Sequence, residues 1–522
     1  MNVLTPLLAL TILAAACAAD PPAKDKPARK PNFTVSRETT YVTGPLDKDG
    51  CVDYATAIDE RLGKGVTPET NANVLIWKAL GPRPLGGKPM PAQFFKPMGM
   101  DEPPEKGEYF VDVRPFVRDR LGIEDREQFS AAFERIYPLT HEPWKVEDHR
   151  QIAEWLKSNE KPLNLVVEGL NRPHYFAPVY RGGDEPTVDL VTAYFARTSA
   201  ALELTTALAV RGMLRVGEGK PADAWPDLLA CQRMGRYVGR GVSLIEALVG
   251  FRCESIGQRA TEALLERPEL DARQLARFLR DLRALPPIPL VSDHLEIGER
   301  FVALERFTIA IRGGSDTVNA LTRGAIHLPP EVDIDWNRAL RNMNAYFDQM
   351  GAALRHKDRG KRQREFDRIE AELQALEKAR GEDGGKSGKG RLGAGAAKRD
   401  VGESIVDILT ALTLPAVRKI QEAYDRTEQG HQNLQIALAS AGYQRDRKKY
   451  PETLEALVPK YLEKLPDDLF TGKPLIYKPS ENGFLLYSLG PNGKDDDGRG
   501  PGDNPKGDDV AIRIPVPKPK NK

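Results

Sequence analysis

An acidic segment near the C-terminal end holds the residues of this chain whose types and spacing best suit chemistry. Seven residues with candidate ligand oxygens fall within eighteen positions and are interleaved with five glycines: Asn492, Asp495, Asp496, Asp497, Asp503, Asp508 and Asp509. Ca²⁺ takes about six to eight oxygen ligands from carboxylates and carbonyls, and glycine lets a loop curl around the ion. The segment therefore predicts a Ca²⁺ site. A solvated acidic loop is the alternative, because like charges repel one another.

A second group of polar residues lies in the aromatic-rich region 81–180. Arg172, His174 and Tyr180 would form a site if the fold brought them together, which is the basis for the hypothesis of an exported enzyme. The chain carries no His-x-x-x-His pair of a metal site and no Gly-x-Ser-x-Gly turn of a hydrolase. We therefore predict that the protein is not an enzyme.

One histidine stands in an acidic neighbourhood with Asp293, Glu296 and Glu299. On a helix, His294 and Glu296 point to different faces, because positions i and i+2 diverge. The pattern predicts a solvated helix face at this place.

Helices must position these residues, since apolar side chains recur at helical spacing over most of the chain. The helical pattern is strongest from Val188 to about Leu285, and the turn from Gly219 to Ala224 matches that of a tetratricopeptide-like hairpin. Further helices are expected at Leu244 to Leu265, Asp271 to Leu282, Glu296 to Ile311 and Trp336 to Leu354. The fold class predicted is mostly α, a TPR-like bundle or solenoid of helical hairpins with a small α+β domain.

Only short strands are expected. One is predicted at Leu163–Val167, within the first half of the chain. Three more are predicted near the C-terminus, after a helix that runs from Val401 to about Gly442: Leu475–Lys478, Phe484–Ser488 and Val510–Ile514.

The region from Gly442 to Ile514 resembles the C-terminal globular part of type II secretion pseudopilins. The likeness rests on Tyr450-Pro451, Leu457-Val458-Pro459, Leu465-Pro466-Asp467, Tyr477 and Tyr487-Ser488-Leu489-Gly490. The whole chain is similar to large exported bacterial proteins that end in this module. The resemblance implies a small α+β fold with a Ca²⁺ ion bound after the last of these motifs. Its implied ligands are the Leu489 carbonyl, Asn492 and one of Asp508 or Asp509.

The first residues predict export. Residues 3–16 form an apolar run of signal-peptide length, which is too short to span a bilayer. Small residues follow, with Ala16-Cys17-Ala18 as a cleavage site, and Cys17 also stands where a lipoprotein carries its lipid. We expect a periplasmic protein, a membrane-anchored lipoprotein or a secreted protein, with membrane attachment through a lipidated Cys17 in the second case.

Charge and cysteine usage narrow the list of partners. The formal net charge of +1 provides no overall attraction to nucleic acid, so no nucleic-acid partner is expected. Cys51, Cys231 and Cys253 remain after the leader, and an odd number argues against a disulfide framework. Buried free thiols are the preferred interpretation, and one disulfide is the alternative.

The domain organisation follows from these patterns. We expect a leader at 1–19, a flexible tether at 20–45, a Pro- and aromatic-rich helical segment at 46–187, a helical domain at 188–357, a charged helix with a Gly-rich linker at 358–400, a long helix with the pseudopilin-like domain at 401–514, and a disordered tail at 515–522. The leading functional hypothesis is a non-catalytic envelope or periplasmic protein that binds other envelope proteins and carries a Ca²⁺-stabilised domain. The alternatives are a component of a type II secretion-like apparatus and an exported enzyme.

Overall fold

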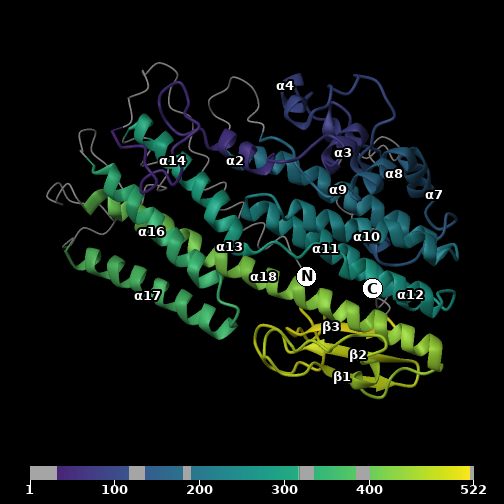
Figure 1. Ribbon diagram of the computed structural model, residues 1–522. Helices are drawn as coiled ribbons and strands as arrows, with labels where there is room; N and C mark the ends of the chain where they lie inside the picture. Colours follow the sequence, from purple (N-terminus) through teal and green to yellow (C-terminus); the bar gives the residue numbers. More distant parts are fainter. Residues whose placement is uncertain are drawn as a thin grey trace.

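The structure is a computed structural model that describes residues 32–116, 136–179, 190–314, 317, 334–383 and 400–517. The predicted leader, Tyr180 and the Gly-rich linker lie outside these residues. The described residues form a mostly helical protein with a small three-stranded antiparallel sheet, which confirms the coarse fold class. Long helices run alongside one another, and the sheet lies against the C-terminal half of the longest of them (Figure 1).

The N-terminal part is built from short helices around aromatic side chains. Its elements are α2 (Tyr54–Leu62), α3 (Ala72–Leu80), η1 (Pro84–Gly86), α4 (Ala92–Phe95), η2 (Lys96–Met98), η3 (Pro138–Thr140), α7 (Arg150–Ser158) and α8 (Glu160–Gly169). The strand expected at Leu163–Val167 is wrong, because this segment lies within α8. Leu163 and Val166 are fully buried at helical spacing, whereas Asn164 is exposed, so the apolar run is one face of a helix.

Four antiparallel helices form the centre: α9 (Leu190–Gly217), α10 (Pro221–Val238), α11 (Leu244–Leu265) and α12 (Ala272–Arg283). Asp271 caps α12 in a capping box with Gln274, as the sequence predicts for this start. Helices α10 and α11 approach closely at glycines. A Cβ atom on Gly250 would lie 2.7 Å from the carbonyl oxygen of Gly235.

A second group of helices extends from the centre. It comprises α13 (Val291–His294), the π-helical turn η4 (Leu295–Glu299), α14 (Arg300–Gly313), α16 (Trp336–Leu354) and α17 (Arg359–Asp383). The bounds of α16 are those predicted. Helix α17 places Phe366, Ile369 and Leu373 against its neighbours and exposes its charged residues.

Helix α18 (Asp400–Arg447) contacts the central helices, the second group of helices and the sheet. Its N-terminal half packs on α16 and α17, and its C-terminal half packs on α11, α12 and the sheet. Ile405 and Val417 join one buried apolar cluster, and Leu434 and Leu438 join the other. The long helix therefore belongs to the core of the helical body as much as to the terminal segment.

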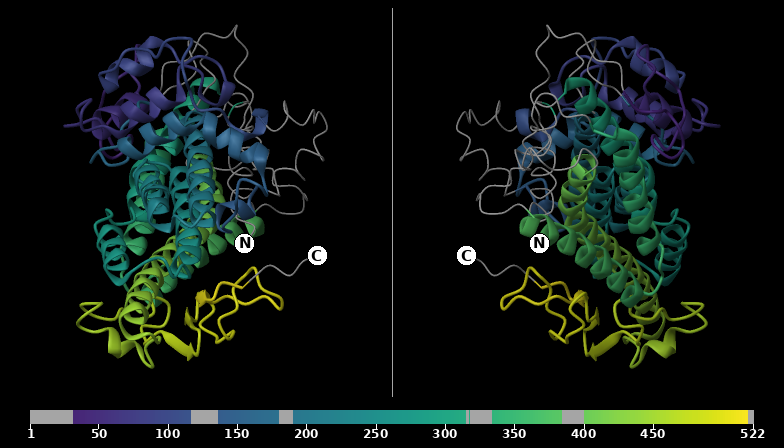
Figure 2. Two further views of the ribbon diagram at one scale, coloured as in Figure 1. Left: turned by 90° about the vertical axis from the view of Figure 1, so that its right-hand side faces the viewer. Right: turned by 90° about the vertical axis from the view of Figure 1, so that its left-hand side faces the viewer.

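The terminal segment folds as a sheet in the order β1 (Ile476–Ser480), β2 (Gly483–Ser488) and β3 (Val510–Ile514), preceded by the 3₁₀ turn η5 (Leu454–Leu457). All three strands lie within a few residues of the predicted ranges. Phe484, Leu486 and Ile512 are buried in the cluster that also holds Leu434. The sheet lies on the opposite side of the long helices from the N-terminal segment (Figure 2).

Candidate functional site

The acidic segment is the long connection between β2 and β3, and its carboxylates are used mainly to bind backbone amides of the same loop. Asp508 Oδ2 accepts from the Asn492 amide at 2.8 Å, and Asp496 Oδ2 accepts from the Asp508 amide at 2.9 Å. Asp509 Oδ2 accepts from the amides of Asp496 and Gly498, at 3.2 and 2.7 Å. The two ends of the connection, around 492–498 and 508–509, are thereby held together.

Asp509 has one oxygen that these bonds leave unused. Its side chain is 2% exposed, and its buried Oδ1 atom has no hydrogen-bond partner among the described residues. Burial, with the nearby charges of Asp496 and Asp495, raises the pKa of Asp509 to about 6. A buried acceptor without a donor costs free energy, so this atom is the place in the loop best suited to a cation.

The four residues implied as Ca²⁺ ligands lie at this end of the sheet. The Asn492 amide donates to Asp508 Oδ2 at 2.8 Å. The side-chain oxygen of Asn492 accepts from the Lys494 amide at 2.6 Å. Leu489 directly follows β2, and its amide donates to Asp468 Oδ2 at 3.1 Å. Of the oxygen atoms of these four residues, Asp509 Oδ1 is the buried acceptor that a hard cation would use. Among the described residues, no three His, Cys, Asp or Glu side chains are already arranged around a common metal position.

Asp468 supports this end of the sheet from below and was not singled out by the sequence analysis. Its Oδ1 accepts from the Ser488 hydroxyl at 2.8 Å and from the Phe470 amide at 2.8 Å. Asp468 is 2% exposed. Because it binds both Ser488 and Leu489, it fixes the point at which β2 ends and the acidic loop begins. Its only signal in the sequence is its place as the second of the two aspartates that follow Leu465-Pro466.

Helix α18 grips the terminal segment with three polar side chains at positions 426, 429 and 433. Arg426 forms an ion pair with Asp508 and donates to its carbonyl oxygen at 3.0 Å. Gln429 Oε1 accepts from the Leu469 amide at 2.8 Å, and Asn433 Nδ2 donates to the Val510 carbonyl at 2.8 Å. We call these three residues the α18 clasp. Polar residues at helical spacing in a buried helix are the signal that could have found it.

The residues proposed for an enzyme site serve the backbone instead where they are described. Arg172 donates to the carbonyls of Pro68 and Asn71, at 2.7 and 3.1 Å. His174 pairs through its backbone with Thr70 and Ala72. Tyr180 lies outside the described residues, so the three-residue site remains a prediction.

An open depression of about 640 Å³ lies in the same region, between the segment 107–111 and helices α7 and α8. Charged residues of both signs line it, among them Glu108, Lys157, Glu160 and Lys161. Lys161 pairs with Glu108 at 2.5 Å, and both side chains are largely exposed.

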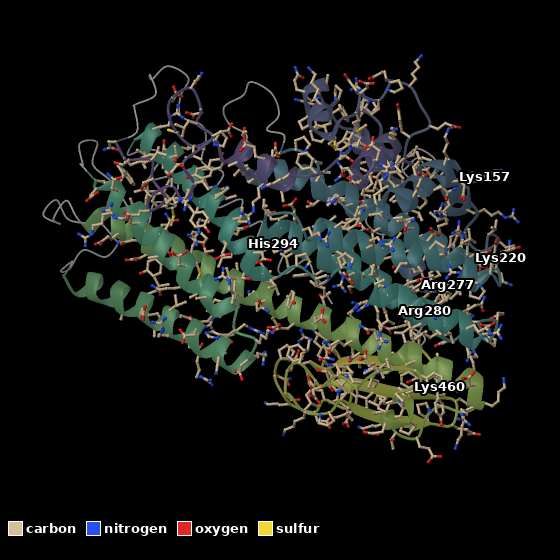
Figure 3. The ribbon with its side chains drawn as sticks, viewed as in Figure 1. Lys157, Lys220, Arg277, Arg280, His294 and Lys460 are labelled. Carbon is tan, nitrogen blue, oxygen red and sulfur yellow. The ribbon has the colours of Figure 1, made fainter. Side chains whose placement is uncertain are left out.

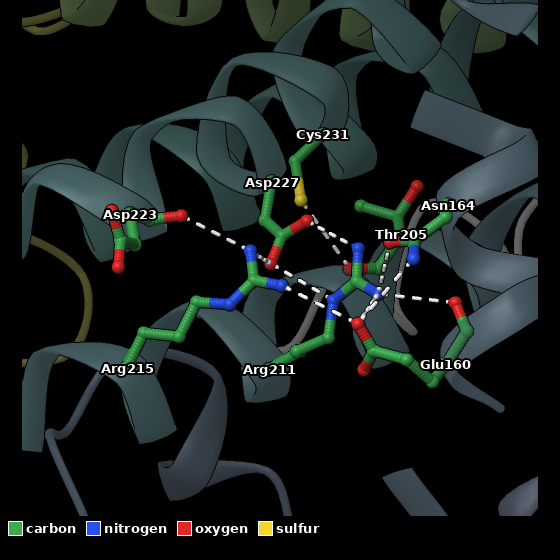
Figure 4. A network of polar contacts seen from close by, with 8 residues as sticks. All are labelled: Glu160, Asn164, Thr205, Arg211, Arg215, Asp223, Asp227 and Cys231. Carbon is green, nitrogen blue, oxygen red and sulfur yellow. Dashed lines mark hydrogen bonds and ion pairs between the residues drawn. The ribbon is translucent and has the colours of Figure 1, made fainter. Parts of the chain in front are cut away.

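A buried ionic network lies behind this depression and joins α8, α9 and α10 (Figure 4). Asp227 accepts two bonds from Arg211, at 2.6 and 3.0 Å, and a third from Arg215 at 2.9 Å. Arg211 also donates to Asn164 Oδ1 at 2.9 Å. Burial raises the pKa of Asp227, and Arg211 acts in the opposite direction. The network holds three helices in register.

His294 is not on a solvated face, so that prediction is wrong. It lies at the end of α13 (Figure 3), is 2% exposed, and has the backbone of Gly241 and Val242 beside its ring. Burial lowers its pKa to about 4. The prediction considered only the helix itself, and α13 turns this face toward α11 and α16.

The three cysteines of the described residues, Cys51, Cys231 and Cys253, are buried and free, as the preferred interpretation expected. Within the same residues, no helix is both long enough and apolar enough to cross a bilayer. Comparison with protein-family models, with curated proteins and with solved structures found no match to this chain.

Proposed function

We propose that this protein is a non-catalytic interaction protein of the bacterial envelope or periplasm. Export by the N-terminal leader brings it there, either free or attached through a lipid on Cys17. Stacked antiparallel helices offer long, rigid faces to other proteins, a use seen in many helical-repeat folds. The fold alone supports a binding role only by analogy with other proteins. An exposed helix face supplies the specific support.

That face belongs to α12 and is the observation that carries the proposal. Arg273, Arg277 and Arg280 follow one another at helical spacing, and all three are exposed. The opposite face of α12 is buried through Leu275, Phe278, Leu279 and Leu282. Arg277 and Arg280 lie on the side of the molecule that carries α12 (Figure 3). We call these three residues the α12 arginine row. The row suits an acidic protein surface, because a guanidinium group binds a carboxylate through two parallel hydrogen bonds.

The finer fold assignments belong to the same proposal. The hairpin of α9 and α10, with its turn at Gly219, supports a TPR-like reading of the central helices. The long helix α18 followed by a small antiparallel sheet supports the pseudopilin-like reading of the terminal segment. A role beside a type II secretion-like apparatus follows from the second reading as an alternative function.

Ca²⁺ binding by the acidic loop is the second part of the proposal. The buried Oδ1 of Asp509 supports it, because that atom has no donor and faces a loop rich in carboxylates. Calcium titration of the full chain tests it, with melting curves recorded beside the heats. Saturable binding that raises Tm and disappears in an Asp508→Ala/Asp509→Ala double variant is the expected result. Neither heat nor a shift of Tm would reject the calcium site.

Crosslinking in envelope extract tests the interaction role. The wild-type chain is compared with an Arg273→Glu/Arg277→Glu/Arg280→Glu variant, whose folding is checked by circular dichroism. We expect a discrete set of crosslinked proteins that the variant loses, and that high salt weakens. A Lys361→Glu/Arg364→Glu/Arg368→Glu variant on α17 is the matched control, because these three side chains are also exposed. If both variants keep the same partners, the α12 arginine row is not the binding face.

An exported enzyme remains a second candidate because of the depression between 107–111 and α8. Its mixed charges and volume of about 640 Å³ suit a small polar ligand. The test is whether a Lys157→Ala/Glu160→Ala variant complements a strain that lacks the protein. Full complementation would argue against an enzyme site in this depression.

A further inference from the structure

A guanidinium group from α18 already sits at the acidic loop. Arg426 donates through Nη1 to the Asp508 carbonyl oxygen at 3.0 Å, and its Nη2 pairs with Asp508 Oδ1. The two side chains are only 14% and 21% exposed, so solvent and salt weaken this pair less than a surface pair. The loop therefore carries a positive charge that the folded chain itself supplies.

The same carboxylate is one that a bound Ca²⁺ ion would use. Asp508 Oδ2 accepts from the Asn492 amide at 2.8 Å. The other oxygen, Oδ1, pairs with Arg426 and is the one that could exchange this partner for a cation. A divalent ion and a guanidinium beside one carboxylate repel each other in a partly buried setting. Asp509 Oδ1, buried and without a donor, shows independently that the loop has an acceptor that Arg426 does not satisfy.

We propose that Arg426 is the resident counter-ion of the acidic loop and competes with divalent cations for Asp508. This inference rests on the proposed calcium binding and names its regulation. Displacement does not strand the guanidinium, because Arg426 Nε lies 3.3 Å from Glu422 Oε1 one turn earlier on α18. Arg426 therefore sets the calcium affinity of the loop.

The competition also connects calcium to the α18 clasp. Gln429 and Asn433 bind the Leu469 amide and the Val510 carbonyl, and neither contact involves a loop carboxylate. Calcium therefore releases the ion pair of Arg426 and leaves the contacts of Gln429 and Asn433 in place. By linkage, the factor by which the Arg426 contact weakens calcium binding is also the factor by which bound calcium weakens that contact.

Calorimetric titration of the full chain with CaCl₂ tests the proposal. The wild type is compared with Arg426→Gln, which removes the competing charge, and with Arg426→Lys, which keeps it. Lys494→Gln is the matched control, because it removes an exposed charge from the same loop without touching the Arg426–Asp508 pair. We expect Kd to fall about ten-fold in Arg426→Gln. Lys494→Gln should change it by less than about three-fold, and Arg426→Lys should stay near the wild type.

The outcomes separate this inference from the calcium proposal beneath it. Equal Kd values in the wild type and Arg426→Gln would overturn the competition and keep the calcium site. Weaker binding in Arg426→Gln would assign Arg426 a positioning role and also overturn it. Absence of heat and of a Tm shift in all four proteins would reject both. If Arg426→Gln does not fold, Arg426→Ala/Glu422→Gln, which leaves neither side chain charged, replaces it with the same expected fall in Kd.

Discussion

Two groups of buried charges between the central helices are matched by side chains of opposite charge. Asp227 is held by Arg211 and Arg215, and Arg236 pairs with Glu254 between α10 and α11. The side chains of Asp227, Arg236 and Glu254 are at most 2% exposed. Removal of one partner from such a pair is far more harmful than the net contribution of the pair suggests, because the other charge remains buried.

Asp227→Asn tests this at the network of Figure 4. It keeps the shape of the side chain but replaces one carboxylate oxygen by an NH₂ group, which cannot accept from Arg211 or Arg215. Burial alone favours a neutral Asp227, but the amide leaves both guanidinium groups without their buried anion, so we expect a loss of about 3–5 kcal/mol in the free energy of unfolding. Urea unfolding followed by circular dichroism measures the loss. Asp223→Asn is the control, since only the backbone carbonyl of the exposed Asp223 accepts from Arg215. It should cost about 0.5 kcal/mol, and equal losses in the two variants would contradict the argument.

Glu203 should make stability depend on pH. Burial, with Asp112 nearby, raises its pKa to about 7, and Arg114 only partly opposes this. A folded-state pKa above the unfolded value of an acid means that stability falls as pH rises from about 4.5 to 7. Glu203→Gln should therefore gain about 3 kcal/mol at pH 8 and little at pH 4. Arg114 keeps Asp112 as its partner at 2.7 Å in this variant. Urea unfolding of the wild type and the variant across this pH range checks the prediction. It would be contradicted if the free energy of unfolding depended on pH equally in both proteins.

At the scale of elements, the helices are ordered by close contacts that only glycine permits. A Cβ on Gly250 would lie 2.7 Å from the Gly235 carbonyl oxygen and 2.9 Å from the Gly239 amide nitrogen. Arg445 adds a different contact, because its guanidinium donates to the carbonyls of Leu270 and Arg267 beyond the end of α11, at 2.9 and 2.8 Å. Such contacts fix how α10, α11 and α18 lie against one another.

Gly250→Ala should push α10 and α11 apart. Backbone atoms on the facing helix cannot move aside cheaply, so we expect a loss of about 1–3 kcal/mol, despite the better helix propensity of alanine. Gly351→Ala in α16 is the matched control. The nearest atom to its Cβ would be Glu296 Cγ at 3.5 Å, an ordinary contact, so this variant should be neutral or stabilised by up to about 1 kcal/mol. Thermal melts of both distinguish crowding from propensity, and similar shifts would argue against the close approach.

At the scale of the molecule, the helical body and the terminal sheet share one core. Leu434 on α18 belongs to the buried cluster that contains Leu228 of α10, Leu264 of α11 and Phe484 of β2. The clasp adds polar contacts at the same junction. The terminal segment is therefore expected to unfold together with α9 to α12.

A fragment of residues 400–522 should not fold as the intact chain does. Removal of the body exposes Leu434 and Leu438, which face α11 and α12 in the full protein. We expect a broad melt and binding of a hydrophobic dye, compared with a cooperative melt of the full chain. Hydrogen exchange of β2 in the full chain should follow that of α11. A sharp, cooperative melt of the fragment would show that the terminal segment is independently stable.

The sequence by itself determined the helical class, the bounds of α11 and α16, the cap of α12 and the strand β3, because periodicity and capping are local properties of the chain. It misassigned α8, whose short apolar run fits both a strand and one buried face of a helix. Tertiary structure alone decided that His294 is interior, that Asp227 meets Arg211, and that Arg426 reaches Asp508 across 82 positions of sequence. Such pairs depend on which faces of distant elements pack together, and no local pattern records that.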